Sequence, residues 1–436
     1  MTLKLSVIGC GYLGATHAAS MSSLGYEVIG VDTDQGKIDL LSRGELPFYE
    51  PGLDTLLAAE IKGGRLSFST DFSLVAKADI HFICVGTPQS KDGLAADLSH
   101  VKAAVAAIAP HIKEGSLVVG KSTVPVGTAQ LLRDQLAISA PQADLAWSPE
   151  FLREGFAVED TLRPVRLVVG VANDRAEEIL KEVYKPIIDL GTPWIRADLP
   201  TAELVKVAAN SFLATKISFI NAMAEVCEVA GGDVTVLAKA IGYDPRIGNR
   251  FLQAGIGFGG GCLPKDIRAF IARAEELGAN QALEFLHEID AINLRARQRV
   301  IHQVKRELGE DLAGFKVAVL GTTFKPDSDD VRDSPALDIA AQLQAAGATV
   351  VVHDPKGIEP ARKVIPNLDY QEKVVDAVKG ADAILHLTEW KEYRELDPSV
   401  IGQLVKSKFI IDGRNMLDRN KWRAAGWRFH ALGRTD

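Results

Sequence analysis

The sequence has 436 residues, of which 47% are hydrophobic and 24% are charged, with a formal net charge of -8. This length exceeds one ordinary hydrophobic core, so we expect two or three globular domains. The acidic balance gives no basis for binding nucleic acid, and without an apolar run of about eighteen residues we expect no membrane span.

The N-terminal stretch MTLKLSVIGCGYLG lacks the charged-then-apolar layout of a signal peptide and predicts a β-strand. The four cysteines, Cys10, Cys84, Cys227 and Cys262, are widely spaced and form no CxxC pair. This spacing argues against a disulfide framework and against a zinc site, and it fits a reducing compartment. We therefore expect a cytoplasmic protein that holds no metal.

Four short apolar runs alternate with helical patterns in the first third of the chain: KLSVIGCG, YEVIGVD, DIHFICVGT and GSLVVGKST. Continuous apolar strands separated by helices predict a parallel sheet that is covered on both faces. We expect residues 1–198 to form an N-terminal, Rossmann-like domain that binds NAD.

A glycine motif follows the first predicted strand. Gly9, Gly11 and Gly14 form GxGxxG, which allows a tight turn and a close approach of the backbone to a pyrophosphate at the helix start. Asp32 ends the next strand, where a carboxylate accepts hydrogen bonds from a free ribose and repels a 2′-phosphate, so NAD is favoured over NADP. Lys37 could reach the adenosine ribose or phosphate. The alternative is a turn-forming glycine cluster beside a solvated Asp32.

Residues 201–230 lack both glycine and proline and are rich in alanine. As one helix they would extend about 45 Å, which is long enough to bridge two domains. Lys206 and Asn210 share one face of this helix, although a surface pair has the same spacing. With the helical patterns that follow, we expect a central helical domain over 199–313.

The stretch GFGGGCLPKD, residues 257–266, places a cysteine at the end of a glycine run. Such a run disfavours helix, and its open backbone can approach a ligand closely. Pro264 suggests that a helix begins there, which would put the Cys262 thiol near a helix N-terminus, where a thiolate is stabilised. Asp266, one turn further on, could accept a proton or orient another group. The alternative for Cys262, as for the other cysteines, is a small buried apolar residue.

The order of elements at the start of the chain returns near its end. FKVAVLG, GATVVVHDP, ADAILHL and KFIIDGR repeat the strand patterns of the first domain. This repetition predicts a second Rossmann-like domain over 314–436. Because GTTFKP stands where GCGYLG stood, we expect this domain to bind something other than a dinucleotide.

Seven motifs occur together and in order: GxGYLG, FICVGTP, STVPVGT, SPEFLREG, FLATKISFIN, FGGGCLPKD and FKPDSDDVRDSP. From about residue 3 to 430 the chain resembles the UDP-glucose 6-dehydrogenase family of nucleotide-sugar dehydrogenases. This resemblance implies an α/β fold with two Rossmann-like, doubly wound parallel-sheet domains joined by a long central helix and a helical domain. It also implies NAD-dependent oxidation of a sugar C6 alcohol to a carboxylate, here UDP-glucose to UDP-glucuronate.

The second oxidation requires that the aldehyde first becomes tetrahedral. A thiolate gives a thiohemiacetal, loss of a hydride gives a thioester, and water releases the acid. The resemblance implies a catalytic role for Cys262 as nucleophile, Lys206 and Asn210 at the oxyanions, Asp266 and Thr123 around a water, and Glu150 in thioester hydrolysis. The group that takes the first proton, Asp266 through a water or Lys206, stays open.

The motifs and the resemblance together predict two binding sites. The cofactor site comprises Gly9, Gly11, Tyr12, Leu13, Gly14, Asp32, Lys37, Val85, Thr87, Thr123, Glu154 and Arg332. The sugar-nucleotide site comprises Glu150, Phe151, Leu152, Arg153, Lys206, Asn210, Arg246, Phe251, Gln253, Gly257, Phe258, Gly259, Lys325 and Arg414. Gln253 stands where relatives carry a lysine or an aromatic residue.

Three further expectations accompany this interpretation. The family carries Arg246 on a loop that reaches a neighbouring subunit, so we expect a homodimer or a higher homo-oligomer. The same chemistry on GDP-mannose or UDP-N-acetylmannosamine is the main alternative, since hexoses differ by few pocket contacts. An NAD-binding redox sensor that uses Cys262 as a switch is the other alternative, although the sequence offers no nearby resolving cysteine.

Overall fold

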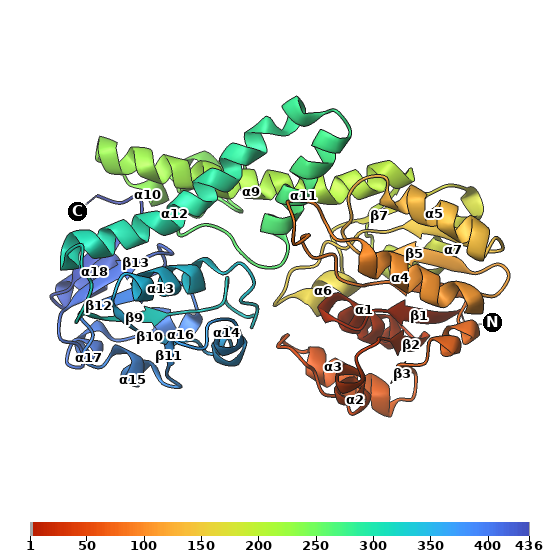
Figure 1. The fold of residues 1–436 in the computed structure, drawn as a ribbon, viewed down its shortest axis with the longest axis horizontal. Coiled ribbons are helices and arrows are strands. Elements are labelled where there is room, and N and C mark those ends of the chain that lie inside the picture. The colour runs from red at the N-terminus through yellow and green to blue at the C-terminus, as the bar shows by residue number, and fades with distance from the viewer. Residues whose placement is uncertain (1–2, 436) are drawn as a thin grey trace. The chain divides into compact units, whose positions relative to one another are not determined.

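The structure is a computed structural model and describes residues 3–435. It divides into two compact units. The first is formed by Met1–Ala209 with Arg268–Gly278, and the second by Asn210–Ile267 with Ala279–Asp436. Each unit is built on its own β-sheet with helices packed on its faces (Figure 1).

The sheet of the first unit has eight strands within the described residues, in the order β3-β2-β1-β4-β5-β6-β7-β8. The strands are β1 (Lys4–Ile8), β2 (Glu27–Val31), β3 (Leu66–Ser69), β4 (Ile80–Ile83), β5 (Leu117–Gly120), β6 (Asp144–Trp147), β7 (Leu167–Val171) and β8 (Trp194–Ala197). The helices are α1 (Tyr12–Ser23), α2 (Gln35–Ser42), α3 (Leu53–Lys62), α4 (Ser99–Ile108), α5 (Thr128–Ser139), α6 (Ala157–Leu162), α7 (Asp174–Val183) and α8 (Lys185–Ile188), with 3₁₀ turns at Phe72–Lys77 and Ala109–His111.

One strand pair departs from the parallel sheet that the sequence predicts. β7 runs antiparallel to β6, with Ala146 opposite Val171, whereas the other neighbouring pairs of this sheet are parallel. Two neighbouring parallel strands need a crossover that carries the chain from the carboxyl end of the first strand back to the amino end of the next. Residues 148–166 hold the SPEFLREG loop and the short α6 and make no such crossover. β7 therefore begins beside the carboxyl end of β6.

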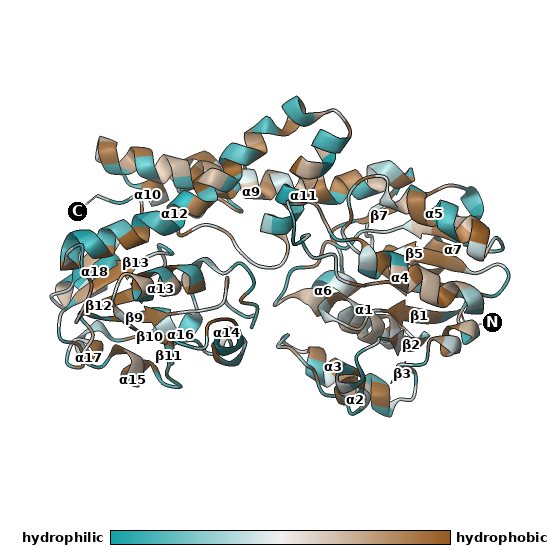
Figure 2. Ribbon diagram, viewed as in Figure 1, coloured by the Kyte–Doolittle hydropathy of each residue, from teal (hydrophilic) through white to brown (hydrophobic). Residues whose placement is uncertain are grey.

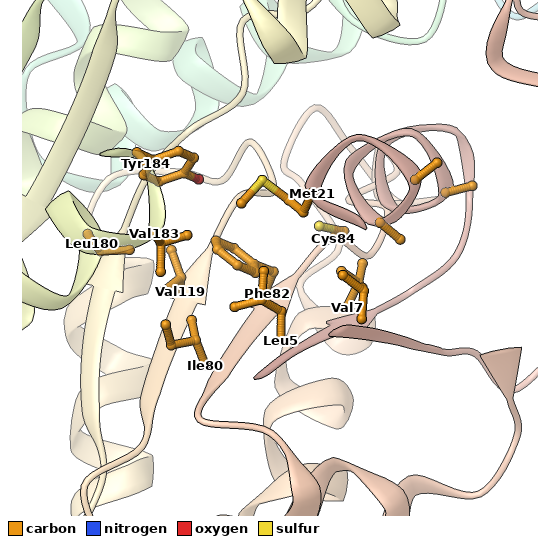
Figure 3. Close-up of a cluster of buried hydrophobic side chains, with 14 of the residues drawn as sticks. Leu5, Val7, Met21, Ile80, Phe82, Cys84, Val119, Leu180, Val183 and Tyr184 are labelled. Carbon is orange, nitrogen blue, oxygen red and sulfur yellow. The ribbon is translucent and has the colours of Figure 1, made fainter. Parts of the chain in front are cut away.

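The strands of this sheet are apolar throughout because both of their faces are buried. In β5, Leu117 and Val119 belong to one hydrophobic cluster and Val118 belongs to another, as the alternation of side chains along a strand requires. The strands are accordingly mostly brown in Figure 2. Figure 3 shows the first cluster, in which Phe82 of β4 lies between Met21 of α1 and the residues of α7.

The second unit repeats this plan with six parallel strands among the residues described, in the order β11-β10-β9-β12-β13-β14. The strands are β9 (Lys316–Leu320), β10 (Thr349–His353), β11 (Asp369–Tyr370), β12 (Ala383–His386), β13 (Phe409–Asp412) and β14 (Arg428–Ala431). The helices are α10 (Val234–Gly242), α12 (Glu284–Leu308), α13 (Pro335–Ala345), α14 (Ile358–Val364), α15 (Val374–Val378), α16 (Lys391–Arg394), α17 (Pro398–Ile401) and α18 (Arg419–Ala424), with a 3₁₀ turn at Asn280–Leu283.

Two further helices begin in one unit and end in the other. The helix α9 (Leu199–Ala230) has 32 residues, and α11 (Leu263–Glu276) has 14. At 1.5 Å per residue α9 is about 48 Å long. The predicted fold is confirmed: two parallel-sheet α/β domains accompany a long central helix, which starts two residues earlier than the sequence suggested.

Candidate active site

The dinucleotide loop joins β1 to α1 in the first unit. Gly9 has a φ of 89°, which favours glycine, and its N–H donates to the carbonyl of Val31. A Cβ on Gly14 would lie 1.8 Å from the carbonyl oxygen of Gly9, so the helix can approach the strand only with glycine there. A Cβ on Gly11 would meet no protein atom within 4 Å. This open approach to the backbone fits a pyrophosphate at the start of α1.

Asp32 lies at the carboxyl end of β2, directly beside this loop. Its carboxylate accepts hydrogen bonds from the N–H groups of Cys10 (2.7 Å) and Asp34 (3.0 Å) and pairs with the Lys37 ammonium at 2.7 Å. Burial alone would raise the pKa of Asp32, but Lys37 and the two N–H donors lower it overall. The carboxylate is thus ionised and placed to accept ribose hydroxyls, which fits NAD.

The other predicted cofactor residues of the first unit gather around neighbouring strand ends. Val85 and Thr87 follow β4, and the Thr87 hydroxyl donates to the carbonyl of Thr123 at 2.7 Å. Leu13 packs against the core beside the sheet. Two other predicted cofactor residues have protein partners. The Tyr12 hydroxyl donates to Glu50. Arg332 belongs to the second unit, where it pairs with Asp330 at 2.6 Å.

The SPEFLREG loop after β6 holds Glu150 with an unpredicted partner. One carboxylate oxygen accepts the N–H groups of Phe151 (2.8 Å) and Leu152 (3.1 Å), and the other pairs at 3.2 Å with the buried ammonium of Lys121. The Lys206 ammonium of α9 lies 5.3 Å from the centre of the Phe151 ring. The first unit therefore brings the predicted residues Glu150, Phe151 and Lys206 together, and adds Lys121, which sequence reasoning missed.

Arg153 of the same loop is held by another element. Its guanidinium forms two hydrogen bonds of 2.8 Å with Asp160 of α6, and its backbone N–H donates to the same carboxylate. These contacts fix the end of the loop. A role of Arg153 toward a ligand stays a prediction.

The glycine run of the second unit is packed against side chains. A Cβ on Gly257 would lie 2.4 Å from the Asn293 side chain, and one on Gly261 would lie 2.2 Å from the Arg332 guanidinium. A Cβ on Gly260, where φ is 84°, would lie 2.8 Å from the Phe324 ring. Protein atoms therefore occupy the space beside these three glycines, which explains why no larger residue fits there, and the approach of their backbone to a ligand stays a prediction.

Cys262 ends this run and directly precedes α11, as predicted. Its side chain is exposed, and its carbonyl accepts the N–H of Asp266 at 3.0 Å. The buried Asp266 carboxylate accepts the Asn210 side-chain N–H at 2.7 Å and pairs with Lys265 at 2.5 Å. Three predicted catalytic residues, Cys262, Asp266 and Asn210, are therefore joined within the second unit.

Arg414, which follows β13, supports the same loop. Its guanidinium donates to the carbonyls of Leu387 (2.7 Å), Phe324 (2.9 Å) and Gly257 (3.2 Å), and burial lowers its pKa. Gln253 donates to the Arg414 carbonyl at 2.9 Å. The structure therefore joins three predicted residues, Arg414, Gln253 and Gly257, and it shows Arg414 holding the loop.

The remaining predicted residues of the second unit are less closely grouped. Phe258 is buried, and its N–H donates to Asn293. Gly259 could not carry a Cβ, which would lie 2.3 Å from the carbonyl of Asp333. The Lys325 ammonium lies over the Phe324 ring at 5.3 Å. Two others are Phe251, which has a φ of 62°, and Arg246, which is exposed and paired with Asp244 at 2.6 Å.

Comparison with known proteins identifies the family. Models of the UDP-glucose/GDP-mannose dehydrogenase family match residues 3–188 (NAD binding domain), 200–295 (central domain) and 318–419 (UDP binding domain). The chain belongs to this family. It is 41% identical to the UDP-glucose 6-dehydrogenase of Rhizobium meliloti over the full length of both chains. It is also 40% identical to the UDP-glucose 6-dehydrogenase TuaD of Bacillus subtilis, covering 99% of this chain and 93% of the relative.

Solved structures of the family share its fold. A UDP-glucose dehydrogenase from Pyrobaculum islandicum is 37% identical, with a TM-score of 0.92 over 100% of this chain and 98% of that one. The UDP-N-acetyl-mannosamine dehydrogenase Cap5O of Staphylococcus aureus is 26% identical, with a TM-score of 0.82 over 99% and 98%. Among residues 3–435 the structure has no helix that is both long and apolar enough to span a bilayer. The same residues contain no cluster of His, Cys, Asp and Glu suited to a metal ion.

Proposed function

We propose that this family member is an NAD-dependent UDP-glucose 6-dehydrogenase that oxidises the C6 alcohol of UDP-glucose to the carboxylate of UDP-glucuronate. The observation that carries the proposal is the group formed by Cys262, Asp266 and Asn210 at the start of α11, in a chain whose first unit holds Asp32 beside the glycine loop. A two-electron dehydrogenase of the same fold has no use for the cysteine. Relatives named UDP-glucose 6-dehydrogenase, about 40% identical over nearly the whole chain, support the substrate.

The proposed chemistry uses Cys262 for the second oxidation. Bound NAD would supply the hydride acceptor for both oxidations. Between them the Cys262 thiolate adds to the aldehyde carbon, and the resulting thiohemiacetal becomes a thioester when that carbon gives up its second hydride. Water then attacks the acyl carbon and the thiolate leaves, which frees the acid and restores the enzyme.

Five residues assist these steps in the proposal. The Lys206 ammonium stabilises the oxyanions, and Asn210, which also holds Asp266, supports the same oxygen. Asp266 transfers protons through a water that Thr123 helps to position, and Lys206 is the second candidate for the first proton. Glu150 assists the hydrolysis of the thioester.

Three segments of the chain have separate roles in the proposal. Residues 1–198 hold NAD, 199–313 carry the connecting helix and Cys262, and 314–436 hold the uridine diphosphate. We place the enzyme in the cytoplasm, which is supported by four cysteines that form no disulfide within residues 3–435. The partners are the sugar nucleotide and further copies of the chain.

The number of NADH molecules formed per sugar tests the function. We expect two NADH per UDP-glucose, because one active site removes both hydrides, and a lower rate with GDP-mannose and UDP-N-acetylmannosamine. The measurement is absorbance of NADH at a limiting amount of each sugar nucleotide. A yield of one would contradict the cysteine mechanism, a preference for another hexose would reassign the substrate, and no turnover would favour the redox sensor.

The assembly we propose is a homodimer, or a larger oligomer built from it, through α9. Phe212, Phe219 and Val226 are 67%, 47% and 56% exposed and recur every seven residues, so they form one apolar stripe along the helix. Such a stripe is self-complementary and suits a two-fold contact between identical chains. NAD and a sugar nucleotide are charged and would not bind to an apolar stripe. This supports a second copy of the chain as the partner that covers it.

Charge introduced into this stripe is expected to separate the subunits. Phe219→Asp should convert the oligomer into smaller species, because a carboxylate would be buried at the contact without a partner. Sedimentation velocity would measure the change. Val364→Asp alters a valine of α14 that is 61% exposed and should leave the assembly intact. A monomeric wild-type protein, or an unchanged Phe219→Asp oligomer, would contradict the proposal.

A further inference from the structure

A buried carboxylate lies between the two predicted binding loops of the first unit. Glu50 belongs to the stretch FYEPGL, between α2 and α3, and is only 3% exposed. It has no part in the proposed chemistry. A buried carboxylate is stable only where donors surround it, so the partners of Glu50 indicate what it holds in place.

Glu50 accepts hydrogen bonds from two distant segments. One oxygen accepts the hydroxyl of Tyr12 and the N–H of Gly155 at 2.7 Å, and the other accepts the N–H of Ala157 at 2.7 Å. The N–H of Gly155 is also directed at the Tyr12 hydroxyl oxygen at 3.2 Å. Tyr12 remains a protonated donor, because burial, together with the bond to Glu50, raises its pKa.

Each of these segments carries residues of a different predicted binding site, and the SPEFLREG loop also carries Glu154 of the predicted cofactor site. Tyr12 is the first residue of α1, inside the GxGYLG loop that fits NAD. Gly155, which has a φ of 80°, ends the SPEFLREG loop that carries Glu150 and Phe151, and Ala157 begins α6 two residues later. The contact between them joins residues 143 positions apart in the chain. A ligand that fixes α1 therefore fixes Glu50, and through Glu50 the end of the sugar-nucleotide loop.

We propose that Glu50 is a positioning residue that couples the dinucleotide loop to the sugar-nucleotide loop, so that the two ligands strengthen each other's binding. This inference rests on the proposed function, since it takes the two loops to be the two binding sites. The first ligand orders the shared contact, and the second then binds to loops that are already in place. By thermodynamic linkage the effect must be equal in both directions.

Two substitutions should weaken the coupling, Glu50→Gln more strongly than Tyr12→Phe. Glu50→Gln keeps the shape of the side chain, but its NH₂ must face the N–H of Ala157 or the donors at Tyr12 and Gly155, because all three partners donate. Tyr12→Phe removes the hydroxyl and leaves the bonds from Gly155 and Ala157 intact. We expect NADH to bind about fivefold or more tightly with UDP-glucose present in the wild type, close to equally in Glu50→Gln, and with an intermediate ratio in Tyr12→Phe.

The measurement is titration of NADH fluorescence with and without saturating UDP-glucose, a pair that cannot react because the cofactor is already reduced. A loss of stability alone lowers the active fraction but leaves the ratio of dissociation constants unchanged. Glu60→Gln is the matched control: Glu60 is a buried carboxylate of α3 that accepts from Ser22 at 2.7 Å and Arg65 at 3.0 Å, outside both loops. It should keep the wild-type ratio.

Several results would overturn the proposal. These are independent binding in the wild type, an intact ratio in Glu50→Gln, and an equal loss in Glu60→Gln. If Glu50→Gln does not fold, Tyr12→Phe provides the test. A wild-type ratio of dissociation constants in Tyr12→Phe would also contradict the proposal. Failure of NADH or UDP-glucose to bind the wild type would contradict the proposed function as well, whereas tight but independent binding contradicts only the coupling.

Discussion

Replacement of Cys262 by serine is expected to lower the formation of UDP-glucuronate by about a thousandfold or more, while NADH binding stays unchanged. A serine hydroxyl is a far weaker acid than a thiol, so it does not supply the anion that adds to the aldehyde carbon at neutral pH. Cys262 directly precedes the 14 residues of α11, and Asp266 lies one turn away. Without the thiolate, the sugar should stop at an aldehyde-level or covalent species. Mass spectrometry of the product and of the intact protein would detect either.

The control for this substitution is another cysteine of the same unit. Cys227 lies on α9 and is buried beside Ile220, Ala224 and Leu252. Cys227→Ala should therefore change stability slightly and leave the yield of acid at the wild-type level. Full acid production by Cys262→Ser would refute the role given to Cys262, and a comparable loss in Cys227→Ala would show that the effect is not specific to it.

The parts of the fold that the sequence predicted are those set by local patterns. Continuous apolar strands, the GxGxxG turn and a long run without glycine or proline depend on neighbouring residues, and they identified both sheets and α9. The direction of β7 depends instead on the path of the connection after β6. Neither the strand pattern nor its length distinguishes a parallel from an antiparallel neighbour, so this feature could not be predicted.

The same division holds for the candidate site. Cys262 before a helix and Asp32 at a strand end were predicted because a motif places them at a defined local position. The partners of the buried charges were missed, because Glu50 and Lys121 act on residues far along the chain. A weak signal existed for Lys121, since it is a charged residue that directly follows the buried strand LVVG. A lysine at such a place needs an anionic partner, but only the fold identifies Glu150.

Lys121→Met is expected to lower the free energy of unfolding by about 1–3 kcal/mol, because it removes the buried member of an ion pair and leaves Glu150, whose side chain is 15% exposed, without its charged partner. Lys121 is 3% exposed, and its ammonium pairs with Glu150 at 3.2 Å and donates to the carbonyl of Ser148 at 3.3 Å. Burial alone would lower the pKa of Lys121, but Glu150 raises it overall. A raised pKa stabilises the fold below the unfolded-state value, and this stabilisation is lost only as the pH rises through the folded-state value. Urea unfolding at neutral pH therefore measures the whole effect.

A surface ion pair provides the comparison for this loss. Lys185 pairs with Asp189 at 3.0 Å, but the two side chains are 68% and 58% exposed, so Lys185→Met should change the free energy of unfolding by less than about 1 kcal/mol. Combining Lys121→Met with Glu150→Gln should recover part of the loss, because the second change removes the charge that the first leaves unpaired. A small loss in Lys121→Met, or strict additivity in the double variant, would mean that the fold does not depend on the pair. In that case the ammonium would be free to serve the hydrolytic step in which Glu150 is proposed to act.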